Sequence, residues 1–208
     1  MRKQQGNETL LDIASAFEQA WLQYRFLVWK LLPFGFMVSF PFFIFFYSMP
    51  GGIAFTVLFE GVAVLMLVSA FRYFRHHEYK DILSMLMQNF WFFVKNGFLL
   101  SLFLFPLLIL GSAVFIFPAV LFFSFFMFSF FEVASNDKFA IDACMESYRM
   151  GRGYRIHLFL FSLVVFASLI IVHIFTDTSP FAFLVVNSFL IPYFVIVINE
   201  LFEQIKKT

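Results

Sequence analysis

Residues 157–176 of the chain read HLFLFSLVVFASLIIVHIFT. This run holds no Asp, Glu, Lys or Arg, and its length matches the roughly 20 apolar residues that a helix needs to cross a bilayer. The segment directly before it, MESYRMGRGYRI (residues 145–156), carries three arginines and two glycines. The sequence therefore predicts a transmembrane helix that starts at a basic boundary.

The composition of the whole chain agrees with a membrane protein. Hydrophobic residues make up 62% of the 208 residues and charged residues only 13%, whereas charged residues approach a quarter of a soluble domain. The 38 Phe side chains supply packing and lipid contact, because a phenyl ring has no hydrogen-bonding or titratable group. The net charge of +1 argues against a nucleic-acid partner, and the single Cys144 excludes an intramolecular disulfide.

Six apolar runs of spanning length follow one another in pairs, which predicts an all-α membrane protein with six transmembrane helices in three hairpins. The hairpins occupy residues 31–71, 97–133 and 157–199 of a single membrane domain, 1–208. In the middle hairpin the turn sequence GSAVFIFP is weak, so a re-entrant hairpin is the alternative there.

The basic residues predict how these hairpins are oriented. All 14 Lys and Arg residues lie outside the predicted spans, and none lies in the short turn inside a hairpin. Because short cytoplasmic segments retain positive charge during insertion, both termini should be cytoplasmic, including the tail 200–208.

A segment with one apolar helical face precedes each hairpin. These segments are residues 8–25, 78–95 and 137–153, in which apolar side chains recur at three- and four-residue steps. We expect them to be amphipathic helices at the cytoplasmic membrane interface. Gly151 and Gly153 should break the last one.

Three polar residues fall inside predicted spans, where an ionisable group is costly. Glu60, His173 and Asn187 form a candidate intramembrane polar site for a proton or cation. The competing interpretation is structural: Glu60 links helices beside Gly61, His173 anchors at the outer interface, and Asn187 hydrogen-bonds across helices.

The basic hinge before the fifth span is the second candidate site. It contains Ser147, Arg149, Arg152, Gly153 and Arg155, whose arginines could bind lipid phosphates at the cytoplasmic face. The alternative is a topology signal whose long side chains reach toward the membrane surface.

No enzymatic motif is present in the sequence. There is no phosphate-binding loop of the Walker type, no dinucleotide fingerprint, no HExxH and no GxSxG. The adjacent pair His76 and His77 has no further ligand at a suitable spacing, so we predict no metal site, no catalytic residue and no cofactor.

Part of the basic hinge resembles a known signature. Ala143, Ser147, Tyr148, Arg149, Met150, Arg152 and Gly153, before a long apolar run, resemble the A-x-x-x-S-aromatic-R-L-x-R/K-G pattern of polytopic bacterial membrane proteins. That group includes the membrane domain associated with glycerophosphodiester phosphodiesterases and related uncharacterised families. A YesL-like membrane family fits the alternation of hairpins and cytoplasmic helices nearly as well. The phosphodiesterase chemistry of the named family belongs to a separate domain, so the resemblance implies a fold and a bacterial inner membrane, not an activity.

These observations favour a non-enzymatic, multi-pass protein of the bacterial cytoplasmic membrane. We expect an accessory or scaffold subunit whose partners are membrane lipids or other membrane proteins. The alternative is a small transporter or channel with Glu60 in a hydrated cavity, and intramembrane catalysis ranks third.

Overall fold

The computed structural model describes residues 11–47, 51–76, 81–114, 116–136, 138–176 and 179–207. Within these ranges the side chains of 42–58, 76, 105, 108–116 and 180 are outside the description. All regular secondary structure in the described part of the chain is helical, which confirms the all-α prediction. The turns predicted at 48–52, 111–118 and 177–180 lie partly outside the described residues.

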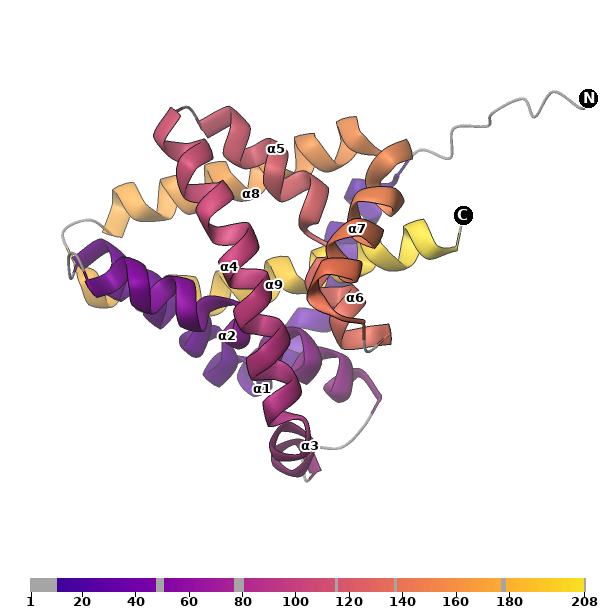
Figure 1. Cartoon of the computed structure of the whole chain (residues 1–208), viewed down its shortest axis with the longest axis horizontal. Coiled ribbons are helices and arrows are strands. Elements are labelled where there is room, and N and C mark those ends of the chain that lie inside the picture. Colours follow the sequence, from indigo (N-terminus) through magenta and orange to yellow (C-terminus); the bar gives the residue numbers. More distant parts are fainter. Residues whose placement is uncertain are drawn as a thin grey trace, which may run out of the picture.

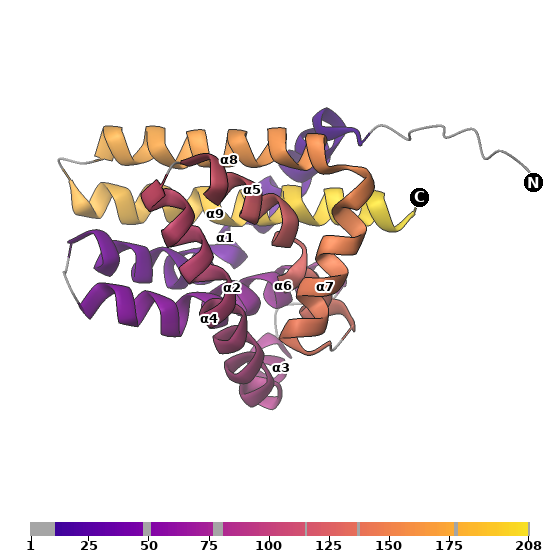
Figure 2. The ribbon, with the colours of Figure 1, turned by 45° about the horizontal axis from the view of Figure 1, so that its top comes forward.

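Six of the described helices form a closed ring. They are α1 (Ile13–Tyr47), α2 (Gly51–His76), α4 (Phe90–Val114), α5 (Ile116–Phe126), α8 (Arg155–Thr176) and α9 (Pro180–Lys206). Around the ring, α1 packs on α9 and α2, α4 packs on α2 and α5, and α8 packs on α5 and α9. Figures 1 and 2 show this arrangement from two directions.

The two ends of the ring are formed by different helix termini. In Figure 2 the end of α8 and the start of α9 lie at the left, as do the end of α1 and the start of α2. The start of α1 and the end of α9 lie at the right. At that right-hand end, the Asp12 N–H donates to the Gln204 side chain, and Gln204 Nε2 donates to the Asp12 carbonyl, both at 3.2 Å. Four shorter elements also lie in the described part of the chain: α3 (Ile82–Gln88), α6 (Ser129–Asn136), α7 (Ala140–Met150) and the 3-10 turn η2 (Gly151–Gly153).

Three helical segments among the described residues are long and apolar enough to cross a membrane. They are Phe117–Asn136, Arg155–Thr176 and Phe181–Lys206, which correspond to the fourth, fifth and sixth predicted spans. The first three predicted spans fall on α1, α2 and α4, whose side chains are described only in part. Membrane association therefore has a structural basis in length and composition.

The helix boundaries differ from the sequence-based ones in the first two amphipathic segments. Segment 8–25 does not form a separate helix, because α1 continues through it into the first span with Pro33 and Pro41 inside. Segment 78–95 is divided at Asn89, whose Nδ2 donates to the Met85 carbonyl, and its second half forms the first turns of α4. No helix-breaking residue occurs between 25 and 31. The amphipathic pattern therefore gives way to an apolar one while the helix continues.

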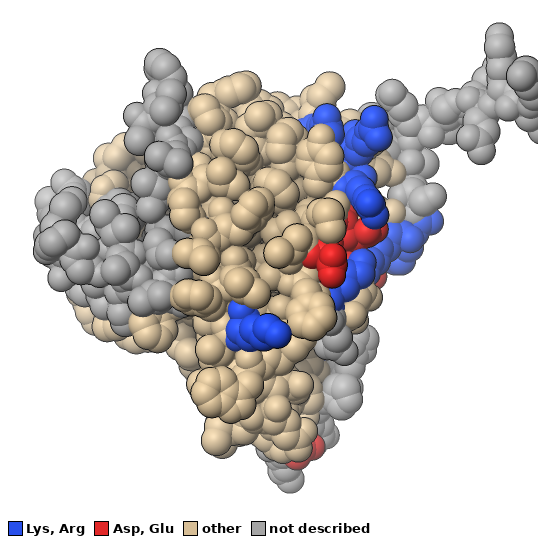
Figure 3. All heavy atoms as spheres, viewed as in Figure 1, with Lys and Arg blue, Asp and Glu red and all other residues tan. Residues whose placement is uncertain are grey.

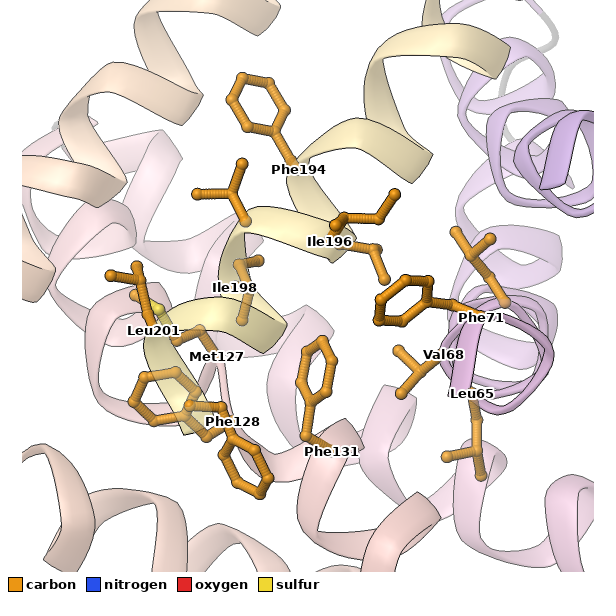
Figure 4. Packing of buried hydrophobic residues seen from close by; sticks show 14 of the residues in the cluster. Leu65, Val68, Phe71, Met127, Phe128, Phe131, Phe194, Ile196, Ile198 and Leu201 are labelled. Atoms are coloured by element: carbon orange, nitrogen blue, oxygen red, sulfur yellow. The ribbon is translucent and has the colours of Figure 1, made fainter. Parts of the chain in front are cut away.

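The fourth predicted span is interrupted. The helix 118–133 predicted from the sequence is α5 followed by α6, with a turn at Met127 and Phe128 between them. Both turn side chains are buried, and Figure 4 shows Met127 and Phe128 beside Leu201 of α9. The Phe202 ring lies 5.7 Å from the Phe128 ring and 5.6 Å from the Phe131 ring, centroid to centroid.

Glycine allows two close helix crossings. A side chain on Gly61 of α2 would collide with the Gly97 carbonyl of α4 and with the Ser101 hydroxyl, which accepts the Gly61 N–H. Likewise, a side chain on Gly35 of α1 would collide with the Ser188 carbonyl of α9. Small residues that bring backbones together in this way are typical of helix packing in membranes.

Candidate functional site

Charged side chains gather at one end of the ring. On the face shown in Figure 3, most of them lie toward the edge where Figure 1 places α6, α7 and the end of α9. Two ion pairs join α2 to α9 at this end: Arg72 to Glu203 at 3.6 Å and Arg75 to Glu200 at 3.4 Å. These pairs are partly exposed, so each contributes at most about 1 kcal/mol.

Among the described residues, the most deeply buried charge at this end is Glu132 of α6, which is 1% exposed. Its carboxylate oxygens lie 2.8 Å from Lys138 Nζ and 3.4 Å from Lys206 Nζ, and Oε2 accepts from Asn136 Nδ2 at 2.7 Å. The hydrogen bond to Glu132 raises the pKa of Lys138, so this lysine keeps its charge. The cluster ties α6, the start of the α7 segment and the last turn of α9 together.

Two buried polar side chains hold α7 in place. Asn96 of α4 accepts the Ala140 N–H at 3.1 Å and so caps the first turn of α7 from another helix. Ser147 of α7 is fully buried; its hydroxyl donates to the Phe125 carbonyl at 2.9 Å and accepts the Phe128 N–H at 3.2 Å. These two backbone groups lie where α5 ends, so Ser147 supplies their hydrogen-bond partner at the break between α5 and α6.

The exposed side of α7 carries a stripe of apolar residues, with the exposed Asp142 and Arg149 beside it. Ile141 is 70% exposed, Met145 49% and Tyr148 43%, whereas Ala143 and Ser147 on the inner side are buried. Within the segment predicted over 137–153, the structure has a helix that ends at Met150 and continues as the Gly151–Gly153 turn. A helix with this distribution is suited to the boundary between water and lipid.

A groove of about 540 Å³ runs along α7 where it faces α4 and the end of α5. Most of its walls are apolar, with α4 contributing Leu99, Leu100 and Phe103, and α7 contributing Ile141, Cys144, Met145 and Tyr148. Arg149 and Arg152 also line it. We call this feature the α4–α7 groove.

The three arginines of the basic hinge are not equivalent. Arg149 is highly exposed, with Nη1 3.8 Å from Glu146 Oε2, and Arg152 is exposed with no ion pair among the described residues. Arg155, at the start of α8, lies instead over two aromatic rings, 4.9 Å from the Tyr148 centroid and 5.3 Å from that of Phe125. Gly153 has open space around it, and no contact would oppose a side chain there.

The intramembrane residues Glu60, His173 and Asn187 lie on three different helices, α2, α8 and α9. Glu60 is 7% exposed, and its Oε2 has no hydrogen-bond partner among the described residues. The His173 ring packs edge-on against Phe183, with the centroids 5.9 Å apart. Asn187 donates to the Phe183 carbonyl of its own helix at 3.0 Å. The α4–α7 groove does not include any of these residues.

Several residues of this end are not predicted from the sequence. Glu132 lies inside the predicted fourth span, so the cost of a charge in a bilayer, which drew attention to Glu60, applied to it equally. Asn96 precedes the third span and carries no signal of its own, because its partner Ala140 is distant in the sequence. No group of three or more His, Cys, Asp or Glu residues that could hold a metal ion occurs in the described part of the chain.

Comparison with known proteins adds no relative. No protein-family model, no curated protein and no solved structure matches the chain. The fold and the groove define a class: an all-helical protein with helices long and apolar enough for a membrane, and a charged end that carries an apolar groove.

Proposed function

We propose that this chain is a non-enzymatic, multi-pass protein of the bacterial cytoplasmic membrane that serves as an accessory or scaffold subunit by engaging membrane lipids. Its α-helical ring crosses the membrane as six spans, with both termini and α7 on the cytoplasmic side. One observation carries the proposal: the outer side of α7 presents exposed apolar residues next to the exposed Arg149 and Arg152.

The physical argument is the pairing of two kinds of surface. Moving exposed apolar side chains such as Ile141 and Met145 from water into the acyl region lowers the free energy by about 25 cal/mol per Å² of surface removed from water. Basic residues beside them are attracted to the anionic lipids of the cytoplasmic leaflet by about 1 kcal/mol each. Only when α7 lies flat on the membrane do apolar burial and charge attraction both favour binding.

The test is gentle purification from native membrane, followed by mass spectrometry of the proteins and lipids that stay bound. We expect retained phospholipid, with or without a membrane protein partner at fixed stoichiometry. Recovery of the chain free of both would contradict the proposal. A matched preparation washed in harsher detergent shows which components bind weakly.

A transport role is the second candidate, and the buried, unpartnered Oε2 atom of Glu60 favours it. If Glu60 carries a proton or cation, Glu60→Gln abolishes ion flux in proteoliposomes while the fold is retained. Glu203→Gln is the control, since it removes a carboxylate that is paired at the surface. Flux that is absent from the unaltered protein, or unchanged in Glu60→Gln, removes this candidate.

A further inference from the structure

The α4–α7 groove has the shape and chemistry of a site for an amphiphile. Its volume of about 540 Å³ lies within the roughly 300 to 1,000 Å³ that small-molecule sites occupy. Leu99, Leu100, Phe103 and Met145 offer no hydrogen bond, so the buried part of a ligand must be apolar. Arg149 and Arg152 are the only charged residues among the described residues that line it, so the ligand's polar part must be anionic.

The position of the groove favours a lipid over a protein segment. Leu102 and Phe103 of α4 are about half exposed beside it, so the apolar outer surface of the proposed span is continuous with the groove. The arginines lie on α7 and η2, and α7 lies near the edge where the charged side chains gather (Figure 1), where lipid phosphates would stand if α4 crosses the membrane. A guanidinium group donates two parallel N–H bonds to a phosphate, which makes arginine well suited to this contact.

The neighbouring charges leave the arginines available. Arg149 forms an exposed ion pair with Glu146, in which the separation of 3.8 Å between Nη1 and Oε2 is longer than a hydrogen bond. Arg155 is engaged with the Tyr148 and Phe125 rings and does not line the groove. Two guanidinium groups, those of Arg149 and Arg152, therefore line the α4–α7 groove.

We propose that the α4–α7 groove binds one anionic phospholipid of the surrounding bilayer, with an acyl chain between α4 and α7 and its phosphate at Arg149 and Arg152. This inference rests on the proposed lipid-engaging function and specifies its site. It makes Ile141 and Met145 determinants of affinity for any phospholipid, and the two arginines determinants of preference for an anionic one.

The experiment is native mass spectrometry of the whole purified chain with phosphatidylglycerol or phosphatidylcholine of identical acyl chains. The double change Arg149→Gln and Arg152→Gln should weaken phosphatidylglycerol binding by about 30-fold at low salt and leave phosphatidylcholine binding nearly unchanged. The double change Ile141→Ser and Met145→Ser should weaken binding of both lipids to a similar extent. All four side chains are exposed, so these changes should not disturb folding.

The control is Arg25→Gln with Lys207→Gln, which removes two exposed positive charges away from the groove. Equal loss of phosphatidylglycerol binding in this control means that binding follows total charge, and overturns the groove assignment. Unchanged phosphatidylglycerol binding after loss of both groove arginines overturns it as well. A dimer of the unaltered chain that the Ile141→Ser and Met145→Ser change dissolves would assign the groove to a second copy instead.

The groove and the proposed function can fail separately. Lipids retained from native membrane, yet insensitive to every groove variant, would leave the lipid-engaging function standing and remove this site. A chain that retains neither lipid nor partner from native membrane would remove the function itself.

Discussion

At the scale of single residues, Ser147 bridges two backbone groups that the interruption of a helix leaves without partners. Ser147→Ala removes the hydroxyl that bonds to Phe125 and Phe128. We expect a loss of about 1 to 3 kcal/mol in the free energy of unfolding, because both groups stay buried. Thermal denaturation in detergent measures it.

Ser168→Ala is the matched control for that change. The Ser168 hydroxyl donates only to the Val164 carbonyl, which already accepts a bond within its own helix, so its loss should cost a few tenths of a kcal/mol. Equal midpoints for the two variants would show that the bridge at the helix break contributes nothing.

Cys144 gives a second test at this scale. Burial raises the pKa of the Cys144 thiol, so at neutral pH it is held as the unreactive neutral form. We expect slow labelling by a maleimide at pH 7 in the folded protein, with the rate rising only at pH values above the ordinary thiol pKa. The same chain unfolded in SDS should label rapidly; fast labelling of the folded protein at pH 7 would contradict the packing of α7.

At the scale of elements, the crossing of α2 and α4 depends on the absence of a side chain at Gly61. Gly61→Ala places a methyl group against the Gly97 backbone, which must move. We expect a destabilisation of about 1 to 3 kcal/mol, the usual cost of overpacking, seen as a lower melting temperature in detergent.

Gly153→Ala is the control for this crossing, because nothing lies within 4 Å of the added methyl group. It should leave the melting temperature nearly unchanged. If the two alanine variants melt together, the close approach of α2 and α4 is not the reason for glycine at position 61.

Elements that depend on local signals could be predicted from the sequence. The amphipathic segment 137–153 has its periodicity and its two glycines in one stretch, and α7 followed by η2 matches it. The interruption between α5 and α6 could not be predicted, because Met127 and Phe128 carry no helix-breaking chemistry and their partner Ser147 lies on another helix. The same holds for the α4–α7 groove, whose walls meet only in the folded chain.

The cost of a charge in a bilayer predicts which acidic residues within a span are buried, but not which residues neutralise them. The sequence predicts Glu60 as an acid within a span, and the structure buries it. Glu132 satisfies the same criterion, but the lysines that neutralise it come from positions 138 and 206, which only the fold brings together.

At the scale of the whole molecule, lipid binding by α7 requires one arrangement: a helical ring across the membrane with its charged end in the cytoplasm. The described spans support membrane association by length and composition. The location of the basic residues predicts the orientation, since positive segments stay in the cytoplasm. Sidedness and the number of spans are therefore the properties to measure.

The most direct measurement is labelling of single cysteines, in a Cys144→Ser background, with a thiol reagent that cannot cross membranes. Ser112→Cys and Thr178→Cys lie in predicted outer turns, whereas Glu146→Cys and Lys207→Cys lie at the charged end. We predict that the first two label on intact cells and the last two only after the membrane is opened. Labelling of Glu146→Cys or Lys207→Cys on intact cells, or of Ser112→Cys only after opening, would contradict the account.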